Sequence, residues 1–537
     1  MKEFSKIIQE ELTKGLRPHE PGRKNKFQLS GLVNMYSTPD GLIPYQLVTL
    51  PVSSGVYSGA SLGSETFPFP QLFILRNKYY VLCATKIYSV NPSSWALTQI
   101  TTYDINDPAS TKAITTGGTW EALDAFDTVL FTNGVCTIVL SGIDTVVADT
   151  YKAFVFDRTT IQAMCLHKGR GILAGFNPST FWGSVWETFW LSYFGDADTG
   201  LAHQRSADGT VYTMAVESNW IWWSSIGGGD LHFLFRPDKL IQGYTDSEYG
   251  NDNPLILDIL SKNEQGFAPM EFKEDIYAVR PLGDFIIVYG EQGIQAMRPV
   301  TSPSPTMQQI PIKAPGLECR GAVAGDNDKH IYLDQSGTLQ MITADLKVTT
   351  LGYKDYLYSL LGGTVIISHS AEYDYDNFGK FYISNGTSGF QLTRNGLCQT
   401  KQYVKSAAFY NGATVGFDTA AGVITDAEGS ILIEEFDFEL PGIKTIEWIR
   451  LGYLSLDTAV QVAVDYRYTM KHDDTWTTSG YKHINTEGIA YFPITGVEFR
   501  LRVKIADYTK LELSYVEFGF KHSDQRYKRS ISVDQIR

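Results

Sequence analysis

Short runs of strand-forming residues alternate with turns containing glycine or asparagine over most of the chain. In residues 283–299, GDFIIVYGEQGIQAMRP, an apolar-aromatic run leads into Gly290, a polar pair and Gly293, and a second apolar run follows. This order is typical of a β-hairpin. We find it in seven segments: residues 72–90, 127–142, 171–186, 220–235, 285–299, 330–343 and 380–393.

The spacing of these hairpins predicts a repeat architecture. Successive turns lie roughly 44 to 63 residues apart, and a blade of four antiparallel strands needs about 40 to 50 residues. Each unit has an apolar face that it cannot bury alone, and stacking around a ring would bury them all. We therefore expect an all-β fold with an irregular, seven-bladed β-propeller over residues 31–428. The alternative is a pair of ordinary β-sandwiches.

The pattern changes after about residue 430, where longer alternating strands begin. Val460, Val462 and Val464 keep one face of a strand apolar, which is the period of a half-buried sheet. We expect a separate β-sandwich over residues 429–521 and a basic tail over residues 522–537.

One segment, at the start of the chain, has the period of a helix. Its apolar residues fall at i, i+3, i+4 and i+8, and a glycine and a proline follow. This stripe is Phe4, Ile7, Ile8 and Leu12. We expect residues 1–30 to form a short N-terminal helix and a basic linker. The stripe either packs on its own domain or docks onto another subunit.

Composition and charge sharpen this picture. The chain contains 31 Tyr, 29 Phe and 10 Trp in 537 residues, which favours strands. Residues 1–30 and 521–537 each carry a net charge of +3, which leaves −20 for the middle of a chain whose total is −14. An acidic body argues against gripping a phosphate backbone. The basic ends are candidate docking arms, and the tail supplies Arg526, Lys528 and Arg529.

Candidate chemistry is sparse. The five cysteines are widely spread and form no CxxC pair, so neither a disulfide framework nor a zinc site is indicated. The first residues lack the apolar core of a signal peptide, and no run of about 18 apolar residues occurs. We expect a protein made in a reducing cytoplasm, with no cofactor and no membrane span.

Two groups of acidic residues are candidate sites. Glu372, Asp374 and Asp376 alternate along EYDYDN, which suits either solvated carboxylates or ligands of a hard cation. The segment 120–127 holds a possible acid/base pair by residue type, or a turn or helix with exposed acids. Its members are Glu121, Asp124 and Asp127. We predict no catalytic residue.

One motif carries a family resemblance. LVNMYSTPDGLIPYQLVTLP, residues 32–51, resembles the opening of the tail hub, or packaged-DNA stabilisation, proteins of short-tailed bacteriophages, whose signature is VNM..TP. The matching residues are Val33, Asn34, Met35, Thr38 and Pro39. The FPGL that usually follows is absent. Residues 285–297, 119–134 and 497–520 are similar to other parts of such proteins.

The resemblance implies a non-enzymatic structural protein of the virion tail. Such proteins form a ring, usually six-fold, below the portal and adaptor proteins. They close the DNA channel, through which packaged double-stranded DNA passes without specific binding, and carry the next tail protein or needle.

A second reading is a carbohydrate-binding or glycan-degrading propeller, resembling a tailspike or a lectin. The tryptophan-rich stretches NWIWWSS and FWGSVWETFW would then supply stacking platforms. A third reading is a propeller scaffold for cellular proteins.

Overall fold

The computed structural model divides the chain into two compact units. The first unit comprises Met1–Val48, Ser370–Val404 and Gly422–Arg537, and the second comprises Thr49–His369 and Lys405–Ala421. The structure describes residues 2–10, 12–16, 27–45, 62, 65–75, 78–91, 93–94, 96–104, 109–125, 128–141, 152–156, 161–175, 203–205, 211–213, 218–224, 226–227, 266–300, 306–372, 378–410, 413–418, 428–440, 442–468 and 475–522.

The second unit contains five small antiparallel sheets that follow one another along the chain. Sheet one is β5 (Gln71–Leu75), β6 (Lys78–Leu82), β7 (Ile87–Val90) and β8 (Leu97–Ile100). Sheet two is β10 (Glu121–Ala125), β11 (Thr128–Thr132), β12 (Thr137–Ser141) and β13 (Lys152–Phe156), with β9 (Thr102–Asp104) added in parallel to β13. Sheet three is β14 (Ala163–His167), β15 (Arg170–Ala174), β18 (Trp220–Trp223) and β19 (Gly266–Pro269). Sheet four is β20 (Ile276–Leu282), β21 (Phe285–Gly290), β22 (Ile294–Val300) and β23 (Thr306–Ile312). Sheet five is β24 (Val323–Gly325), β25 (Lys329–Leu333), β26 (Leu339–Thr343) and β27 (Val348–Gly352).

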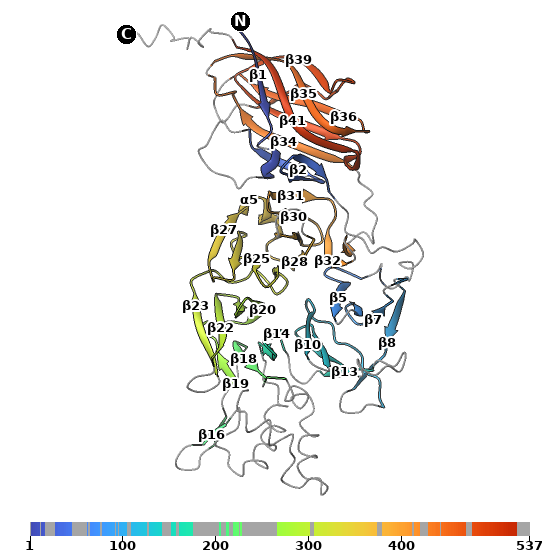
Figure 1. Ribbon diagram of the computed structural model, residues 1–537, viewed down its shortest axis with the longest axis vertical. Coiled ribbons are helices and arrows are strands. Elements are labelled where there is room, and N and C mark those ends of the chain that lie inside the picture. Colours follow the sequence, from blue (N-terminus) through green and yellow to red (C-terminus); the bar gives the residue numbers. More distant parts are fainter. Residues whose placement is uncertain are drawn as a thin grey trace, which may run out of the picture. The chain divides into compact units, whose positions relative to one another are not determined.

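Figure 1 shows these sheets arranged about a common centre, with β5, β10, β14 and β20 on the inside and β8, β13, β19 and β23 on the outside. Neighbouring sheets share apolar cores. Tyr80 of sheet one meets Phe131 of sheet two at a ring distance of 5.6 Å, and Tyr289 of sheet four meets Tyr332 of sheet five at 5.5 Å. The stacking of apolar faces expected from the sequence is therefore present in this unit.

Smaller elements complete the unit. The hairpin β32 (Val404–Tyr410) and β33 (Ala413–Asp418) packs on sheet one, where Val415 and Phe417 join the core around Val81. The remaining elements are β16 (His203–Arg205), β17 (Val211–Thr213), α5 (Lys354–Leu357), the 3-10 turn η5 (Tyr358–Leu360) and β28 (Ile366–Ser370). Among the described residues α5 is the one α-helix, and no helix there is long and apolar enough to cross a membrane.

The expected count of seven separate hairpin units is wrong at one point. Segments 171–186 and 220–235 contribute β15 and β18, which pair with each other inside sheet three. More than forty residues of sequence separate these adjacent strands. The segment inserted between β15 and β18 is about as long as the segment that normally separates the hairpins of two different sheets. Counting hairpins by their spacing therefore counted sheet three twice.

The first unit consists of two sheets. One has the order β3 (Met35–Thr38), β4 (Gly41–Pro44), β41 (Leu511–His522), β35 (Lys444–Leu456) and β39 (Ile489–Gly496), with β1 (Lys2–Ile8) also paired to β41. The other includes, in order, β29 (Lys380–Ser384), β30 (Gly389–Thr393), β31 (Gly396–Thr400), β2 (Leu29–Val33), β34 (Gly429–Phe436), β40 (Glu498–Ile505), β36 (Val460–Arg467) and β37 (Thr477–Thr478), with β38 (Lys482–His483) on β36. Two 3-10 turns are η1 (Leu12–Lys14) and η6 (Tyr508–Lys510).

Aromatic side chains join the two sheets of the first unit. Phe436 and Phe499 come from the sheet that contains β34 and β40, and Phe518 comes from β41 of the other sheet. The Phe436 and Phe518 rings lie 5.0 Å apart, and the Phe438 ring stacks on Phe520 at 4.0 Å. Residues 429–521 therefore do contribute strands to two facing sheets, as the alternating pattern predicted.

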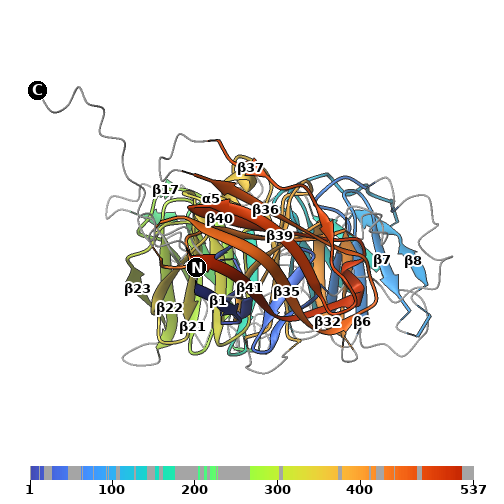
Figure 2. The same ribbon diagram turned by 90° about the horizontal axis from the view of Figure 1, so that it is seen from above.

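The expected N-terminal helix is wrong. Residues Lys2–Ile8 form β1, which runs antiparallel to β41 from Lys2 opposite His522 to Ile8 opposite Val516 (Figure 2). A helix this short is marginal by itself, whereas pairing with a long strand satisfies the backbone along its length. Tertiary pairing has overridden a local pattern.

The first unit also extends beyond the expected sandwich boundaries. It takes in residues 1–48 and 370–404, which the sequence assigned to the docking arm and the propeller. The reason is strand pairing across the chain, because β2 lies between β31 and β34, and β1 and β4 both pair with β41. Such pairings join segments about 400 residues or more apart and leave no local signal.

Candidate functional site

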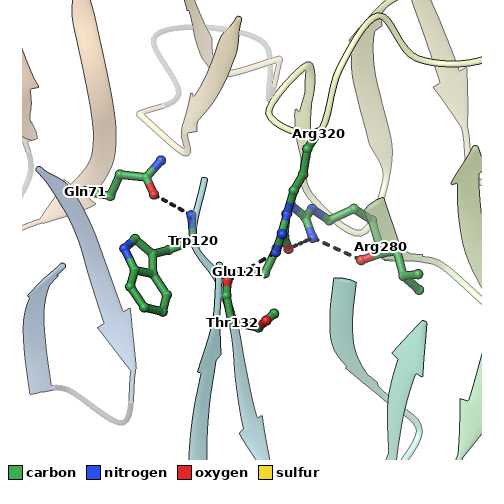
Figure 3. Close-up of polar contacts among 7 residues, drawn as sticks. Gln71, Trp120, Glu121, Thr132, Arg280 and Arg320 are labelled. Carbon is green, nitrogen blue, oxygen red and sulfur yellow. Dashed lines mark hydrogen bonds and ion pairs between the residues drawn. The ribbon is translucent and has the colours of Figure 1, made fainter. Parts of the chain in front are cut away.

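A cluster of charged side chains lies at the centre of the second unit (Figure 3). Glu121 begins β10 of sheet two, and its side chain is only 5% exposed. Arg280, in β20 of sheet four, binds this carboxylate through both of its terminal nitrogens. Arg280 Nη2 donates to Glu121 Oε1 at 2.6 Å, and Nη1 donates to Oε2. This bidentate pair joins two sheets that are not neighbours in sequence.

The pKa of Arg280 reflects this partner. Burial alone would lower the pKa of the guanidinium, but the charge and hydrogen bonds of Glu121 outweigh burial and raise it. Glu121 is therefore the counter-charge of Arg280, and both of its carboxylate oxygens accept hydrogen bonds from that guanidinium.

A second arginine reaches the same centre. Arg320 precedes β24 of sheet five, and its Nη2 donates to the carbonyl oxygen of Thr132 in sheet two at 3.2 Å. Its Nη1 donates to Gln162 Oε1, just before β14 of sheet three, at 3.4 Å. Burial lowers the pKa of Arg320 to about 10; the charge of Arg280 adds to this, and that of Glu121 opposes it.

Hydrogen bonds between uncharged groups connect the polar centre to sheet one. The backbone N–H of Trp120 donates to Gln71 Oε1 at 2.7 Å (Figure 3). In addition, Trp120 Nε1 donates to the carbonyl oxygen of Cys83 at 3.0 Å. Sheets one, two and four, together with the segments that lead into sheets three and five, thus all send a side chain or backbone group into the centre.

The acidic segment 120–127 forms strand β10 over Glu121–Ala125. Glu121 and Asp124 lie three residues apart on strand β10, so their side chains leave opposite faces. Asp127 lies outside the described residues. The expectation of a turn or helix is therefore wrong for Glu121 and Asp124, which lie on a strand, and their opposite faces argue against these two residues acting as an acid/base pair.

The alternating acids of EYDYDN are only partly described. Glu372 forms an ion pair with the buried Lys380 at 2.9 Å, which gives this carboxylate a structural partner. Asp374 and Asp376 lie outside the described residues. Among the residues that the structure describes, no group of three or more His, Cys, Asp or Glu is placed to hold a metal ion.

The tryptophans proposed as stacking platforms are buried where they are described. Trp220, Trp222 and Trp223 form β18 in the interior of sheet three, and none is more than 9% exposed. The second stretch, FWGSVWETFW, lies outside the described residues.

The four apolar residues of the N-terminal stripe are divided by strand β1 and the following turn. Ile8 and Leu12 are fully buried, whereas Phe4 is 39% and Ile7 55% exposed. Phe4 stacks on Phe520 of β41 at 5.7 Å. Arg526, Lys528 and Arg529 of the basic tail lie outside the described residues. The exposed apolar surface of β1 is therefore limited to Phe4 and Ile7.

We predict that Ile8→Asp and Ile7→Asp behave differently. Ile8→Asp places a carboxylate in the core and is expected to lower the free energy of unfolding by about 3 kcal/mol or more. Ile7→Asp on the exposed face should stay within about 0.5 kcal/mol of the parent. Urea unfolding measures both. Equal losses would contradict the strand, since a helical stripe would bury both residues.

The motif at residues 33–39 forms a structural junction of the first unit. Asn34 is fully buried with a positive φ of 57°. Its Nδ2 donates to the carbonyl oxygen of Glu428, and its Oδ1 accepts from the backbone N–H of Lys401, both at 2.8 Å. Asparagine suits this place because it tolerates the left-handed conformation and both donates and accepts.

Other residues of this stretch are also constrained by packing, although Val33 is half-buried and Pro39 is exposed. Met35 and Thr38 are buried, and the Thr38 hydroxyl donates to the carbonyl oxygen of Gly41 at 3.1 Å. Gly41 has a φ of 141°, and a Cβ there would lie 2.2 Å from the carbonyl oxygen of Leu513. Only glycine fits this approach to β41. These residue identities are thus explained by packing.

The sequence pointed to Glu121 but missed Arg280 and Arg320. One signal was available for Arg280, which interrupts the apolar strand IYAVRPL and so required a buried partner. Arg320 lies in a connection, and nothing in the local pattern distinguishes it from a solvated arginine.

Comparisons with known proteins add little. No family model and no curated protein matches the chain. The WD40 domain of Pan2 from Neurospora crassa aligns with 67% of this chain and 85% of its own length, at 8% identity and a TM-score of 0.32. PorZ of Porphyromonas gingivalis, a surface component of the type-IX secretion system, aligns with 58% of this chain and 36% of its own, at 8% identity and a TM-score of 0.21. At these scores neither likeness carries an argument about function.

Proposed function

We propose that this chain is a non-enzymatic structural protein of a short-tailed bacteriophage tail, a hub or nozzle component that forms a ring below the portal and adaptor. The observation that carries the proposal is the motif at residues 33–39. Its resemblance to the tail hub signature falls on five residues, of which three are buried, one is half-buried and one is exposed. The buried residues are Asn34, Met35 and Thr38, the half-buried one is Val33 and the exposed one is Pro39. Because packing constrains the buried positions, a resemblance there supports a similarity in fold.

The second unit supports a scaffold role. We infer that its sheets form an irregular β-propeller, because they succeed one another around a centre with their first strands inside (Figure 1). The centre is tied together by Glu121, Arg280 and Arg320. A carboxylate with both oxygens engaged by an arginine is poorly suited to proton transfer.

The glycan-directed alternative has less support. A sugar platform needs an exposed aromatic face, and the described tryptophans of NWIWWSS are buried in sheet three. Glycoside hydrolysis needs two carboxyl groups flanking one cleft, and Glu121 and Asp124 leave opposite faces of β10.

Strand β1 is the candidate docking element among the described residues. It lies beside β41 at one edge of its sheet and keeps Phe4 and Ile7 partly exposed. An edge strand offers backbone groups to a partner chain, and the two side chains add apolar contact. The basic tail, with Arg526, Lys528 and Arg529, remains the second proposed contact.

The test is co-sedimentation of the purified chain with a portal–adaptor assembly. The proposal expects stable binding and no hydrolysis of glycans. Ile7→Asp, which should leave folding intact, and deletion of residues 523–537 should each weaken binding if those surfaces dock. A chain that does not bind the assembly and releases sugars from glycans would refute the proposal.

A further inference from the structure

The polar centre of the second unit carries an excess positive charge. Three charged side chains meet there: Glu121, Arg280 and Arg320 (Figure 3). Both carboxylate oxygens of Glu121 accept hydrogen bonds from Arg280. The cluster therefore has one carboxylate for two guanidinium groups, and both oxygens of that carboxylate are bound to Arg280.

The Arg320 guanidinium has more N–H donors than there are acceptor atoms around it. A guanidinium has five N–H donors, and the two acceptors of Arg320 are neutral oxygens at 3.2 and 3.4 Å. Its Nε is buried and has no hydrogen-bond partner among the described residues. No carboxylate in that part of the chain lies within ion-pair distance of it. The Arg320 residue as a whole is half-buried. A buried N–H donor without an acceptor is unfavourable unless a ligand completes it.

The surroundings of the Arg320 side chain are shaped by glycine. A Cβ at Gly134, which has a φ of 83°, would lie 2.0 Å from Arg320 Nη1, and one at Gly118 would lie 3.9 Å from Arg320 Cδ. The neighbouring Arg280 side chain keeps 26% of its surface exposed, so the cluster is open to solvent on one side. A small ligand can therefore reach the two guanidinium groups.

We propose that the centre of the second unit binds a small oxyanion, such as inorganic phosphate or a carboxylate, at the Arg320 guanidinium. The anion accepts from the N–H groups of Arg320 that lack partners and neutralises the excess charge. Planar donor pairs of arginine match the oxygens of both ligand types. This inference is independent of the tail hub proposal and stands or falls without it.

Titration with inorganic phosphate, followed by 31P NMR and by thermal unfolding at constant ionic strength, tests the site. Binding to the folded state should raise the folding equilibrium constant about tenfold when phosphate reaches about ten times its dissociation constant. A parallel titration with acetate separates a carboxylate preference from a phosphate preference. Constant ionic strength removes general screening.

Variants locate the effect. Arg320→Gln should abolish the phosphate response, whereas Arg298→Gln should keep it, because Arg298 is an exposed arginine of sheet four. If Arg320→Gln does not fold, Arg320→Lys takes its place; it keeps a positive charge but loses the planar donor pair, so it should bind phosphate more weakly than the parent. No response in the parent, the same response in Arg320→Gln, or unchanged affinity in Arg320→Lys would overturn the site.

Discussion

Glu121→Gln is expected to lower the free energy of unfolding by about 3–5 kcal/mol, the cost of breaking a buried ion pair by removing one partner. The amide keeps the size of the side chain but removes its charge. Arg280 and Arg320 would then face each other at the centre of the second unit with no counter-charge among the described residues. Urea unfolding at neutral pH measures the loss.

Glu274→Gln is the matched control. Glu274 is an exposed carboxylate of the same unit that accepts one hydrogen bond from Gln292 at 3.2 Å. Its substitution should change the free energy of unfolding by no more than about 0.5 kcal/mol. If Glu121→Gln were as mild as this control, the central cluster would not hold the sheets together.

Acidification is expected to destabilise the second unit through His330. His330 Nε2 lies 3.0 Å from the carbonyl oxygen of Pro281, which can only accept, so Nε2 carries the hydrogen. Nδ1 then accepts from the Tyr289 hydroxyl at 2.8 Å. This arrangement suits a neutral imidazole, and burial lowers the pKa of His330 to about 4.

Proton linkage gives the direction in which stability changes with pH. The unfolded imidazole titrates near pH 6.5, so between about pH 6.5 and pH 4 the unfolded state binds more protons than the folded state. Stability is complete above about pH 6.5, falls through this window and loses about 3 kcal/mol by about pH 4 from His330 alone. Burial also lowers the pKa of His369 to about 4, which adds in the same direction.

Unfolding curves at closely spaced pH values, for the parent and for His330→Gln, measure this contribution. The variant should show a smaller loss between pH 6.5 and pH 4. The control is His483→Gln on β38, where the ring lies at an exposed contact with Gln461. Identical pH slopes for the parent and His330→Gln would contradict the assigned protonation state.

Local pattern was sufficient for strand content and for many hairpins. Residues 285–299 form β21 and β22, joined by a turn in which the Gly290 N–H donates to the carbonyl oxygen of Gly293 at 2.8 Å. Both strands are apolar on both faces because the sheet is packed on both sides. Here neighbouring residues in sequence are also partners in space, so periodicity carries the information.

Pairings across the chain could not be read in the same way. The residues of β1 have a helical period, and only contact with β41, about 510 residues later, makes them a strand. The central cluster has the same character. Glu121, Arg280 and Arg320 are spread over 200 residues, and only the arrangement of the sheets brings them together. The one local signal for the cluster is Arg280, a charged residue inside an otherwise apolar strand.

The mass and symmetry of the assembled protein test the central proposal most directly. Mass photometry and electron-microscopic class averages of the purified chain, alone and with a portal–adaptor assembly, would give both. We expect closed rings with rotational symmetry, formed either by the purified chain alone or on the portal–adaptor assembly. A chain that stays monomeric under both conditions, with its fold intact, would contradict it.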